Sequence, residues 1–192
     1  SYYADIEDQT LQELPFISGF IGTCSFDLVR HEFPILKQIE LEDHPQHDVK
    51  FYMIEDVYVF DHYKDELYII STNLFSQVKQ DVLIQRVKER IEDLKAIQVY
   101  QPKVSFQVQD KQIEANVSEQ HFMNIVSDLK KKITEGDMFQ VVPSRIYRYK
   151  HHFNNQLQAL SFQLYQNLKR QNPSPYMYYI NMEKPIIIGS SP

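Results

Sequence analysis

The sequence predicts an α+β protein in which antiparallel strand pairs are separated by amphipathic helices. Two observations indicate this class. Runs rich in β-branched and aromatic residues come in closely spaced pairs, as at 51–60 and 66–72. Other stretches repeat apolar residues every three to five positions, which is the period of an amphipathic helix. Since strands and helices do not alternate one for one, the pattern disfavours a parallel sheet of βαβ units.

The first half of the chain is expected to hold three strands and one helix. The apolar run 16–22 contains two of the chain's four glycines and predicts a buried strand with a bulge or a close backbone approach. After an acidic loop at 40–48, the runs 51–60 and 66–72 predict a hairpin. Residues 76–96 place apolar side chains on one face and charges elsewhere, which predicts an amphipathic helix.

The second half begins with strand-like residues at 104–117. Ser118 can cap a helix that buries an apolar face and ends at Gly136, because glycine readily takes the left-handed conformation after a helix. Residues 138–149 again predict a strand, which Pro143 restricts to a sheet edge or a bulge.

The carboxyl-terminal part predicts a helix followed by a hairpin. Four leucines between 157 and 168 mark the helix, which Asn154 or Asn155 would open and which ends before the sequence NPSP. The runs 176–182 and 185–190 then predict two short strands in succession.

Composition and charge exclude several classes of protein. With 43% hydrophobic and 24% charged residues, the 192-residue chain is typical of a folded globular protein. The 20 basic and 26 acidic residues give a net charge of −6, which argues against a nucleic-acid partner. No apolar run approaches the ~20 residues of a membrane span, so no membrane partner is expected. A single cysteine favours a reducing compartment, the cytoplasm.

The chain shows no repeat and no Gly/Ser-rich linker, so two lobes, if present, meet near residues 100–103. We therefore expect residues 1–100 to form an amino-terminal strand-rich lobe with one long helix. Residues 101–192 then form a second lobe.

Short catalytic motifs are absent from the sequence, and the isolated candidates each have two interpretations. His44 and His47 have the spacing of metal ligands, yet a solvated acidic loop explains them equally well. Cys24 has no histidine or basic residue close by in sequence to activate it. A small buried hydrophobe is therefore favoured over a nucleophile.

Gln140 and the segment Asn172–Met177 are the stronger candidates. Gln140 follows the Gly136 turn on a predicted strand, and its neutral amide can orient a substrate but cannot act as a base. Pro173 and Pro175 fix two backbone φ angles, so this rigid turn could present Tyr176 and Met177 to an aromatic ligand. The alternative is a stiff turn that delivers a tyrosine to the core.

Taken together, the motifs resemble those of the chorismate-utilising enzymes. Their order and approximate spacing are those of component I of anthranilate synthase, and they span about Leu14 to Pro192: LPFISGFIG at 14–22, VFDH at 59–62, EGDMFQVVPS at 135–144, NPSPYMYYI at 172–180 and IIIGSSP at 186–192. All four glycines of this glycine-poor chain belong to these motifs.

The resemblance implies antiparallel sheets packed as a sandwich with external helices, of which this chain holds only part. Residues 101–192 would be the start of the chorismate-binding domain, truncated before its catalytic half. The implied parent enzyme is a carbon–oxygen lyase that uses Mg²⁺ and converts chorismate and ammonia to anthranilate and pyruvate in tryptophan biosynthesis. The ammonia would come from glutamine through an amidotransferase partner, component II, and L-tryptophan would act as feedback inhibitor.

The resemblance also implies roles for particular residues. Pro175, Tyr176 and Met177 would contact the inhibitor L-tryptophan, while Asn172 and Ser174 would shape the turn. Gln140 would line the chorismate pocket, at a position where water-adding relatives carry a lysine that activates water. A glutamine there cannot act as that base, which agrees with ammonia as the nucleophile.

The chain also departs from the family pattern. The family's catalytic histidine and magnesium-binding glutamates have no counterpart in this sequence, so the segment alone is expected to be inactive and to bind tryptophan weakly or not at all. Two alternatives remain open. Component I of aminodeoxychorismate synthase is disfavoured by Val142-Pro143-Ser144, and a stand-alone tryptophan-sensing module is disfavoured because the sequence stops inside a strand motif.

Overall fold

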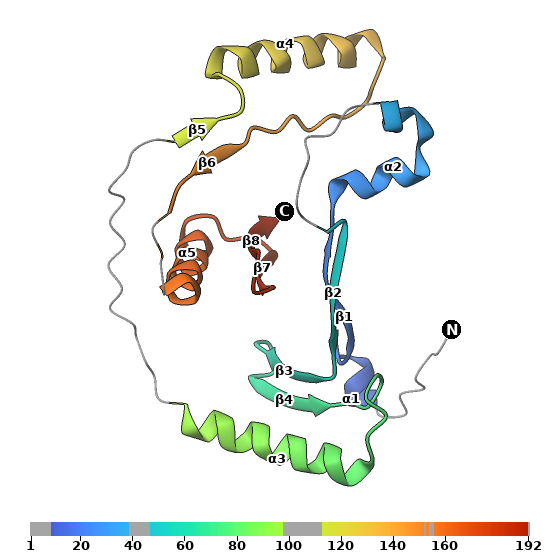
Figure 1. The fold of residues 1–192 in the computed structure, drawn as a ribbon, viewed down its shortest axis with the longest axis vertical. Coiled ribbons are helices and arrows are strands. Elements are labelled where there is room, and N and C mark those ends of the chain that lie inside the picture. The colour runs from blue at the N-terminus through green and yellow to red at the C-terminus, as the bar shows by residue number, and fades with distance from the viewer. Residues whose placement is uncertain (1–8, 39–46, 98–112, 152, 154–155, 192) are drawn as a thin grey trace. The chain divides into compact units, whose positions relative to one another are not determined.

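The computed structural model describes residues 9–38, 47–97, 113–151, 153 and 156–191 (Figure 1). The chain divides into two compact units, Ser1–Tyr100 and Gln101–Pro192. Within the described ranges, the strands pair into four two-stranded antiparallel sheets, β1–β2, β3–β4, β5–β6 and β7–β8. The α+β class with antiparallel strand pairs is therefore confirmed.

In the first unit, short helical segments precede and follow the first strand in the sequence, and one long helix follows the second strand pair. In chain order the elements are α1 (Gln9–Gln12), β1 (Gly19–Cys24), the 3₁₀ turn η1 (Phe26–Leu28), α2 (Val29–Glu32), the 3₁₀ turn η2 (Pro34–Gln38), β2 (Val49–Ile54), β3 (Asp56–Asp61), β4 (Glu66–Ser71) and α3 (Gln80–Ala96).

The second unit has two helices and two strand pairs in its described residues. Its elements are β5 (Ile113–Ala115), α4 (Glu119–Glu135), β6 (Tyr147–Tyr149), α5 (Leu157–Gln171), β7 (Tyr176–Asn181) and β8 (Ile186–Ser191). The predicted carboxyl-terminal helix and hairpin are confirmed by α5, β7 and β8. Asn154 and Asn155, the expected openers of that helix, lie outside the described residues.

The prediction of one continuous strand at 51–60 is wrong. The chain breaks at Glu55 into β2 and β3, and the two halves have different partners. β2 pairs with β1 over six residues, whereas β3 pairs with β4 to form the expected hairpin. The side-chain pattern is the same on both sides of the break, so alternation alone does not reveal where the chain changes partner.

The strand predicted at 138–149 is also mostly absent. Within the described ranges, Tyr147–Tyr149 forms strand β6, paired with β5, and residues 138–146 have no strand partner. Pro143 lacks the N–H that a ladder requires, which agrees with this interruption. The predicted strand residues before Ile113 lie outside the described residues.

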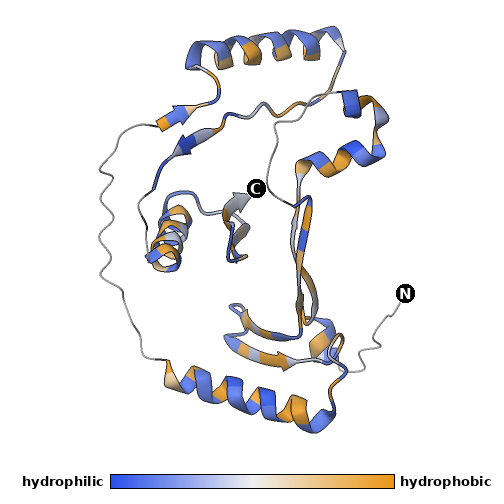
Figure 2. Cartoon of the chain, viewed as in Figure 1, coloured by the Kyte–Doolittle hydropathy of each residue, from blue (hydrophilic) through white to orange (hydrophobic). Residues whose placement is uncertain are grey.

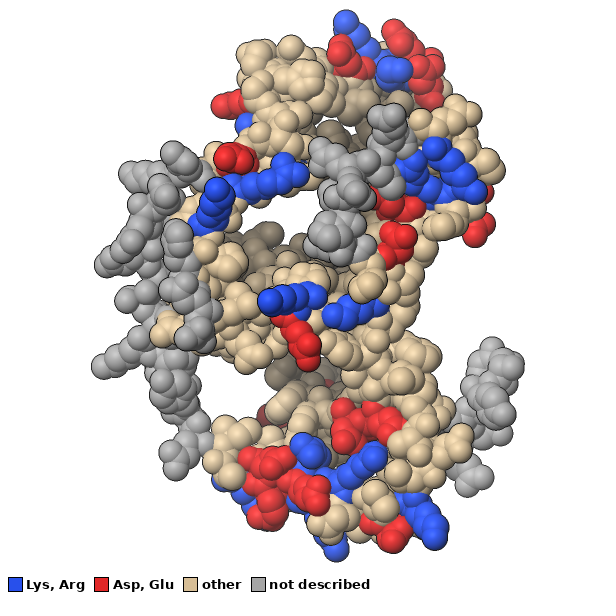
Figure 3. Space-filling view, in the orientation of Figure 1, with Lys and Arg blue, Asp and Glu red and all other residues tan. Residues whose placement is uncertain are grey.

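The two long helices have the expected amphipathic pattern. The Ser118 hydroxyl caps α4 by accepting a hydrogen bond from the His121 N–H at 3.2 Å, and Gly136 ends the helix with a left-handed φ of 85°. Apolar residues recur along one side of α4 (Figure 2). α3 begins at Gln80 instead of residue 76 and packs against β4. Side chains of both charges lie interspersed over the α3 surface (Figure 3).

Burial is lower than the sequence predicts. The run 16–22 was expected to be a buried strand, but Phe20 on β1 is 60% exposed. Cys24 is exposed too, so its interpretation as a small buried hydrophobe is wrong. A two-stranded sheet has no further strands to broaden its faces, so much of its apolar surface stays open to solvent.

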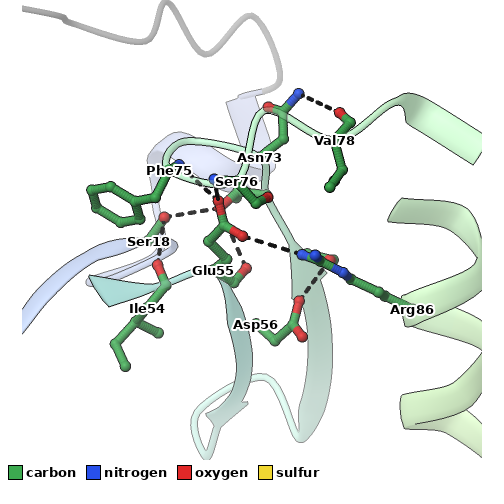
Figure 4. A network of polar contacts seen from close by, with 11 residues as sticks. Ser18, Ile54, Glu55, Asp56, Asn73, Phe75, Ser76, Val78 and Arg86 are labelled. Carbon is green, nitrogen blue, oxygen red and sulfur yellow. Dashed lines mark hydrogen bonds and ion pairs between the residues drawn. The ribbon is translucent and has the colours of Figure 1, made fainter. Parts of the chain in front are cut away.

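A polar network around Glu55 joins the two strand pairs of the first unit to α3 (Figure 4). One Glu55 carboxylate oxygen accepts hydrogen bonds from the backbone N–H groups of Phe75 and Ser76, both at 2.7 Å. The other oxygen lies 3.2 Å from an Arg86 guanidinium nitrogen on α3. The backbone oxygen of Glu55 accepts from the N–H of Thr72 at 2.8 Å. The strand break at Glu55 therefore fixes the β4–α3 connection.

This environment strongly favours the ionised form of Glu55. Desolvation of the carboxylate raises its pKa, but the hydrogen bonds from Ser76 and Phe75 and the bond to Arg86 outweigh that effect. The net result lowers the pKa of Glu55 from its ordinary 4.5 to about 2. Because the side chain is only 14% exposed, solvent screens these contacts little.

The first prediction concerns this network. Glu55→Gln removes the charge that the two amides and Arg86 bind, so unfolding free energy at pH 7 should fall by about 1–3 kcal/mol. The native pKa lies below 4.5, so the stabilisation is present above pH 4.5 and disappears as the pH falls toward 2. Urea unfolding followed by circular dichroism at pH 7, 4.5 and 3 should show the variant and the parent converging in acid.

Glu92→Gln is the matched control, because Glu92 forms an exposed ion pair with Lys95 on α3. Such pairs contribute little, so this change should cost less than about 0.5 kcal/mol. An equal loss of stability in the two variants at pH 7 would contradict the structural role of Glu55.

The second prediction concerns the open faces of the strand pairs. Phe20 and Met53 are directly paired between β1 and β2 and are 60% and 64% exposed. Exposed apolar faces and strand edges promote association, so the chain should self-associate as its concentration rises. Sedimentation velocity over a concentration series should show this, and the double change Phe20→Ser with Met53→Ser should reduce it. A chain that stays monomeric throughout and unfolds in one sharp transition would contradict this expectation.

Candidate functional site

In the second unit, helix α5 packs against the β7–β8 hairpin. The hairpin pairs six residues on each strand, from Tyr176 opposite Ser191 to Asn181 opposite Ile186. The hydroxyls of Ser161 on α5 and Tyr179 on β7 lie 2.9 Å apart. Around this contact Leu160, Ser161 and Met182 are buried. The helix and the hairpin therefore hold both ends of the segment between them.

That connecting segment, residues 172–175, is the turn singled out in the sequence. Asn172 ends α5, and its N–H donates to the backbone oxygen of Leu168 at 2.8 Å. The Ser190 hydroxyl on β8 donates to the backbone oxygen of Asn172 at 2.7 Å. The Ser174 hydroxyl donates to the backbone oxygen of Tyr176 at 3.2 Å. The turn is therefore tied to the helix, to β8 and to the first residue of β7.

The first two residues of β7 point to opposite faces of the hairpin, as neighbouring strand residues do. Met177 is half-buried and shares its face with Ser190, its partner in register, and with Tyr179, which contacts α5. Tyr176 lies on the other face and is 69% exposed. The alternative in which the turn delivers Tyr176 to the core is therefore wrong.

The predicted inhibitor residues are thus only partly brought together. Asn172, Ser174 and the exposed Pro175 form the turn, and Met177 follows on the face of the hairpin that α5 covers. The ring of Tyr176 lies on the opposite face from the side chain of Met177. Their proposed contacts with one ligand remain a prediction, and the geometry favours Met177 as the side chain beside the turn.

On the face of the hairpin opposite to α5, the lack of a side chain at Gly189 allows the Tyr178 ring to cross closely over the neighbouring strand. Tyr178 lies directly opposite Gly189, and a Cβ at position 189 would overlap the tyrosine ring. The ring therefore occupies the space of a missing side chain on the neighbouring strand. This fixes Tyr178 in register and, with it, the start of β7.

Gln140 lies in the unpaired segment after α4 and is exposed. The prediction that Gln140 lies on a strand is wrong, because residues 138–146 are not in a strand. Its role in a chorismate pocket stays a prediction. The neighbouring Phe139 is fully exposed. Among the described residues, no hydrogen bond joins Gln140 to Asn172 or Ser190.

The described part of the chain contains no candidate metal site. No group of three or more His, Cys, Asp or Glu side chains there could hold a metal ion. His44, half of the predicted pair with His47, lies outside the described residues. We therefore assign no metal ligand among the described residues. In the same ranges, no helix is both long and apolar enough to cross a bilayer.

Two polar residues were missed by the sequence analysis. Glu55 borders an open cavity of about 700 Å³ that Met53, Phe75 and Arg86 also line. Its carboxylate is engaged with Arg86 and the loop, so we assign it a structural role. The pair of acids Glu55-Asp56 between two apolar runs was the available signal for Glu55. Apart from its place in the IIIGSSP motif, nothing in the sequence indicated a role for Ser190.

Comparison with known proteins identifies the class to which this fold and turn belong. Residues 2–192 match the sequence profile of a family described as chorismate binding enzyme. The chain therefore belongs to the chorismate-binding enzyme family.

Within this family the chain is similar to proteins of two names. It is 35% identical to anthranilate synthase component 1 from Vibrio cholerae over 89% of this chain and 31% of that protein. It is 30% identical to aminodeoxychorismate synthase component 1 from Bacillus subtilis over 100% of this chain and 39% of that protein.

A solved structure agrees. The crystal structure of anthranilate synthase component I from Streptococcus pneumoniae matches with a TM-score of 0.70 and 27% identity, over 94% of this chain and 40% of that one. The fold is thus similar to part of that enzyme, and the resemblance seen in the motifs is confirmed. The chain spans about a third of the length of the curated relatives.

The third prediction tests the Gly189–Tyr178 crossing. Gly189→Ala should destabilise the chain by about 1–3 kcal/mol, because the added methyl overlaps the Tyr178 ring and forces it to move. In a Tyr178→Ala background the same change should cost much less, which a double-mutant cycle by urea unfolding measures. Equal costs in both backgrounds would mean that the ring does not occupy this space.

Proposed function

We propose that this chain is part of component I of an anthranilate synthase. The whole enzyme converts chorismate and ammonia to anthranilate and pyruvate in tryptophan biosynthesis, a carbon–oxygen lyase reaction. The relatives named anthranilate synthase component 1 and the similar solved structure support the assignment. The ammonia comes from glutamine through an amidotransferase, component II. The enzyme works in the cytoplasm with Mg²⁺, for which this chain provides no assigned ligand, and the 192-residue chain alone is inactive.

The part of this function that the described residues carry is feedback inhibition by L-tryptophan at the turn 172–177. The observation that supports it most directly is the triple attachment of the turn to α5, β7 and β8. A rigid turn loses little conformational entropy when it binds a ligand. Met177 offers an adaptable thioether to an indole ring, and the Asn172 side chain offers both a donor and an acceptor for the amino-acid end.

Gln140 is proposed to line the chorismate pocket of the complete enzyme. Its exposed amide can donate hydrogen bonds to a carboxylate and accept one from ammonia, yet it cannot take a proton from water. This property fits an enzyme that adds ammonia.

Aminodeoxychorismate synthase component I is the second candidate, because the relative of that name matches the entire chain. Val142-Pro143-Ser144 favours the anthranilate branch. The two activities are distinguished by incubating the full-length protein with chorismate, Mg²⁺ and ammonia and identifying the product. Anthranilate with free pyruvate supports the first candidate, and an amino product that retains the enolpyruvyl group supports the second.

The fourth prediction tests the inhibitor site. The chain contains no tryptophan, so indole fluorescence in a titration comes only from added L-tryptophan. Its anisotropy should rise weakly but saturably as the chain is added. Met177→Ala should abolish the rise, because it removes the side chain proposed to contact the indole.

Met123→Ala is the matched control, since Met123 is a half-exposed methionine on α4. This variant should bind as the parent does. A flat titration both for the folded chain and for the full-length enzyme would contradict the inhibitor site, as would equal losses in both variants.

A further inference from the structure

The backbone of Asn172 is held from two sides. Its N–H closes the last turn of α5 on Leu168, and its carbonyl oxygen accepts the Ser190 hydroxyl at 2.7 Å. Leu168 and Ser190 belong to different elements, the helix and the last strand. The contact therefore links the end of α5 to β8 across 18 residues of sequence.

The turn has few other means of attachment. Pro173 and Pro175 have no N–H, so of the residues between Asn172 and Tyr176 only Ser174 has a backbone donor. The Ser174 hydroxyl bonds forward to Tyr176, within the same segment. Among the described side chains that lie outside the turn, Ser190 is thus the one whose hydroxyl donates a hydrogen bond to it.

The register gives this contact its direction. Ser190 lies opposite Met177, and paired residues of an antiparallel ladder project on the same face. Ser191 lies opposite Tyr176 and projects on the other face. One side chain therefore borders both the turn and the methionine beside it.

We propose that Ser190 is a positioning residue for the tryptophan site: its hydroxyl fixes Asn172 and thereby sets the turn against Met177. The idea rests on the proposed inhibitor site, but it makes a separate claim about the turn. Loss of the hydroxyl leaves the fold intact, because Asn172 is exposed and water can satisfy its carbonyl. What is lost is the placement of the turn.

The experiment compares three variants of the chain with the parent. Ser190→Ala removes the donor, Ser190→Thr keeps a hydroxyl on a residue that suits a strand, and Ser191→Ala removes the neighbouring hydroxyl on the other face. Amide hydrogen exchange is measured by NMR for Asn172, whose N–H bonds to Leu168, and for Tyr176, which pairs with Ser191, with Leu129 on α4 as an internal reference. L-Tryptophan affinity is measured by anisotropy in the same samples.

In Ser190→Ala we expect the Asn172 and Tyr176 amides to exchange about threefold to tenfold faster, because the turn opens more readily once one hydrogen bond that holds it is lost. The affinity for L-tryptophan should fall by a similar factor. Ser190→Thr and Ser191→Ala should stay within twofold of the parent, and Leu129 should not change in any variant.

The exchange rates decide the positioning role and the binding data decide the site. Unchanged exchange in Ser190→Ala overturns the proposal, and so does equally fast exchange in Ser190→Thr, since the hydroxyl is then not the cause. Faster exchange in Ser190→Ala, with no tryptophan binding by any form of the chain or by the full-length enzyme, supports Ser190 as the anchor of the turn and refutes the inhibitor site alone.

Discussion

Backbone pairing between β7 and β8 is the constraint on which the candidate site depends. Six consecutive residue pairs fix the register, and a shift by one residue would move every side chain to the opposite face. In the observed register Tyr179 meets Ser161 on α5, and Met177 lies opposite the serine that holds the turn. The helix, the turn and the strands are therefore positioned by a single ladder.

The strand pairs differ in how well they are covered. The β7–β8 hairpin has α5 packed on one face, and the residues around that contact are among the few that are buried in the described part of the chain. The β1–β2 pair keeps large apolar side chains such as Phe20 and Met53 exposed. The first unit is held at its strand break by the charged and polar contacts of Glu55. Apolar burial and polar anchoring thus stabilise different parts of this chain.

Local patterns predicted the elements whose signals lie within a few residues. The α4 helix was correctly delimited by Ser118 and Gly136, because capping is a local effect. Errors arose where the outcome depends on partners distant in sequence. Nothing local shows that the strand run changes partner at Glu55, or that no strand among the described residues pairs with the residues around Gln140. For the same reason the turn could be predicted from its prolines, whereas its attachment to Ser190 could not.

The crossing of Tyr178 over Gly189 also limits how this hairpin can diverge during evolution. A side chain at position 189 can be accepted only after the ring opposite has been replaced by a smaller one, and a large ring at 178 requires glycine at 189. The order of substitutions is therefore constrained, and the two positions should change together. Homologous chains should have either a large aromatic residue at position 178 with glycine at 189, or a small residue at 178 with a residue that bears a side chain at 189. A large aromatic residue at 178 together with a side chain at 189 should be rare.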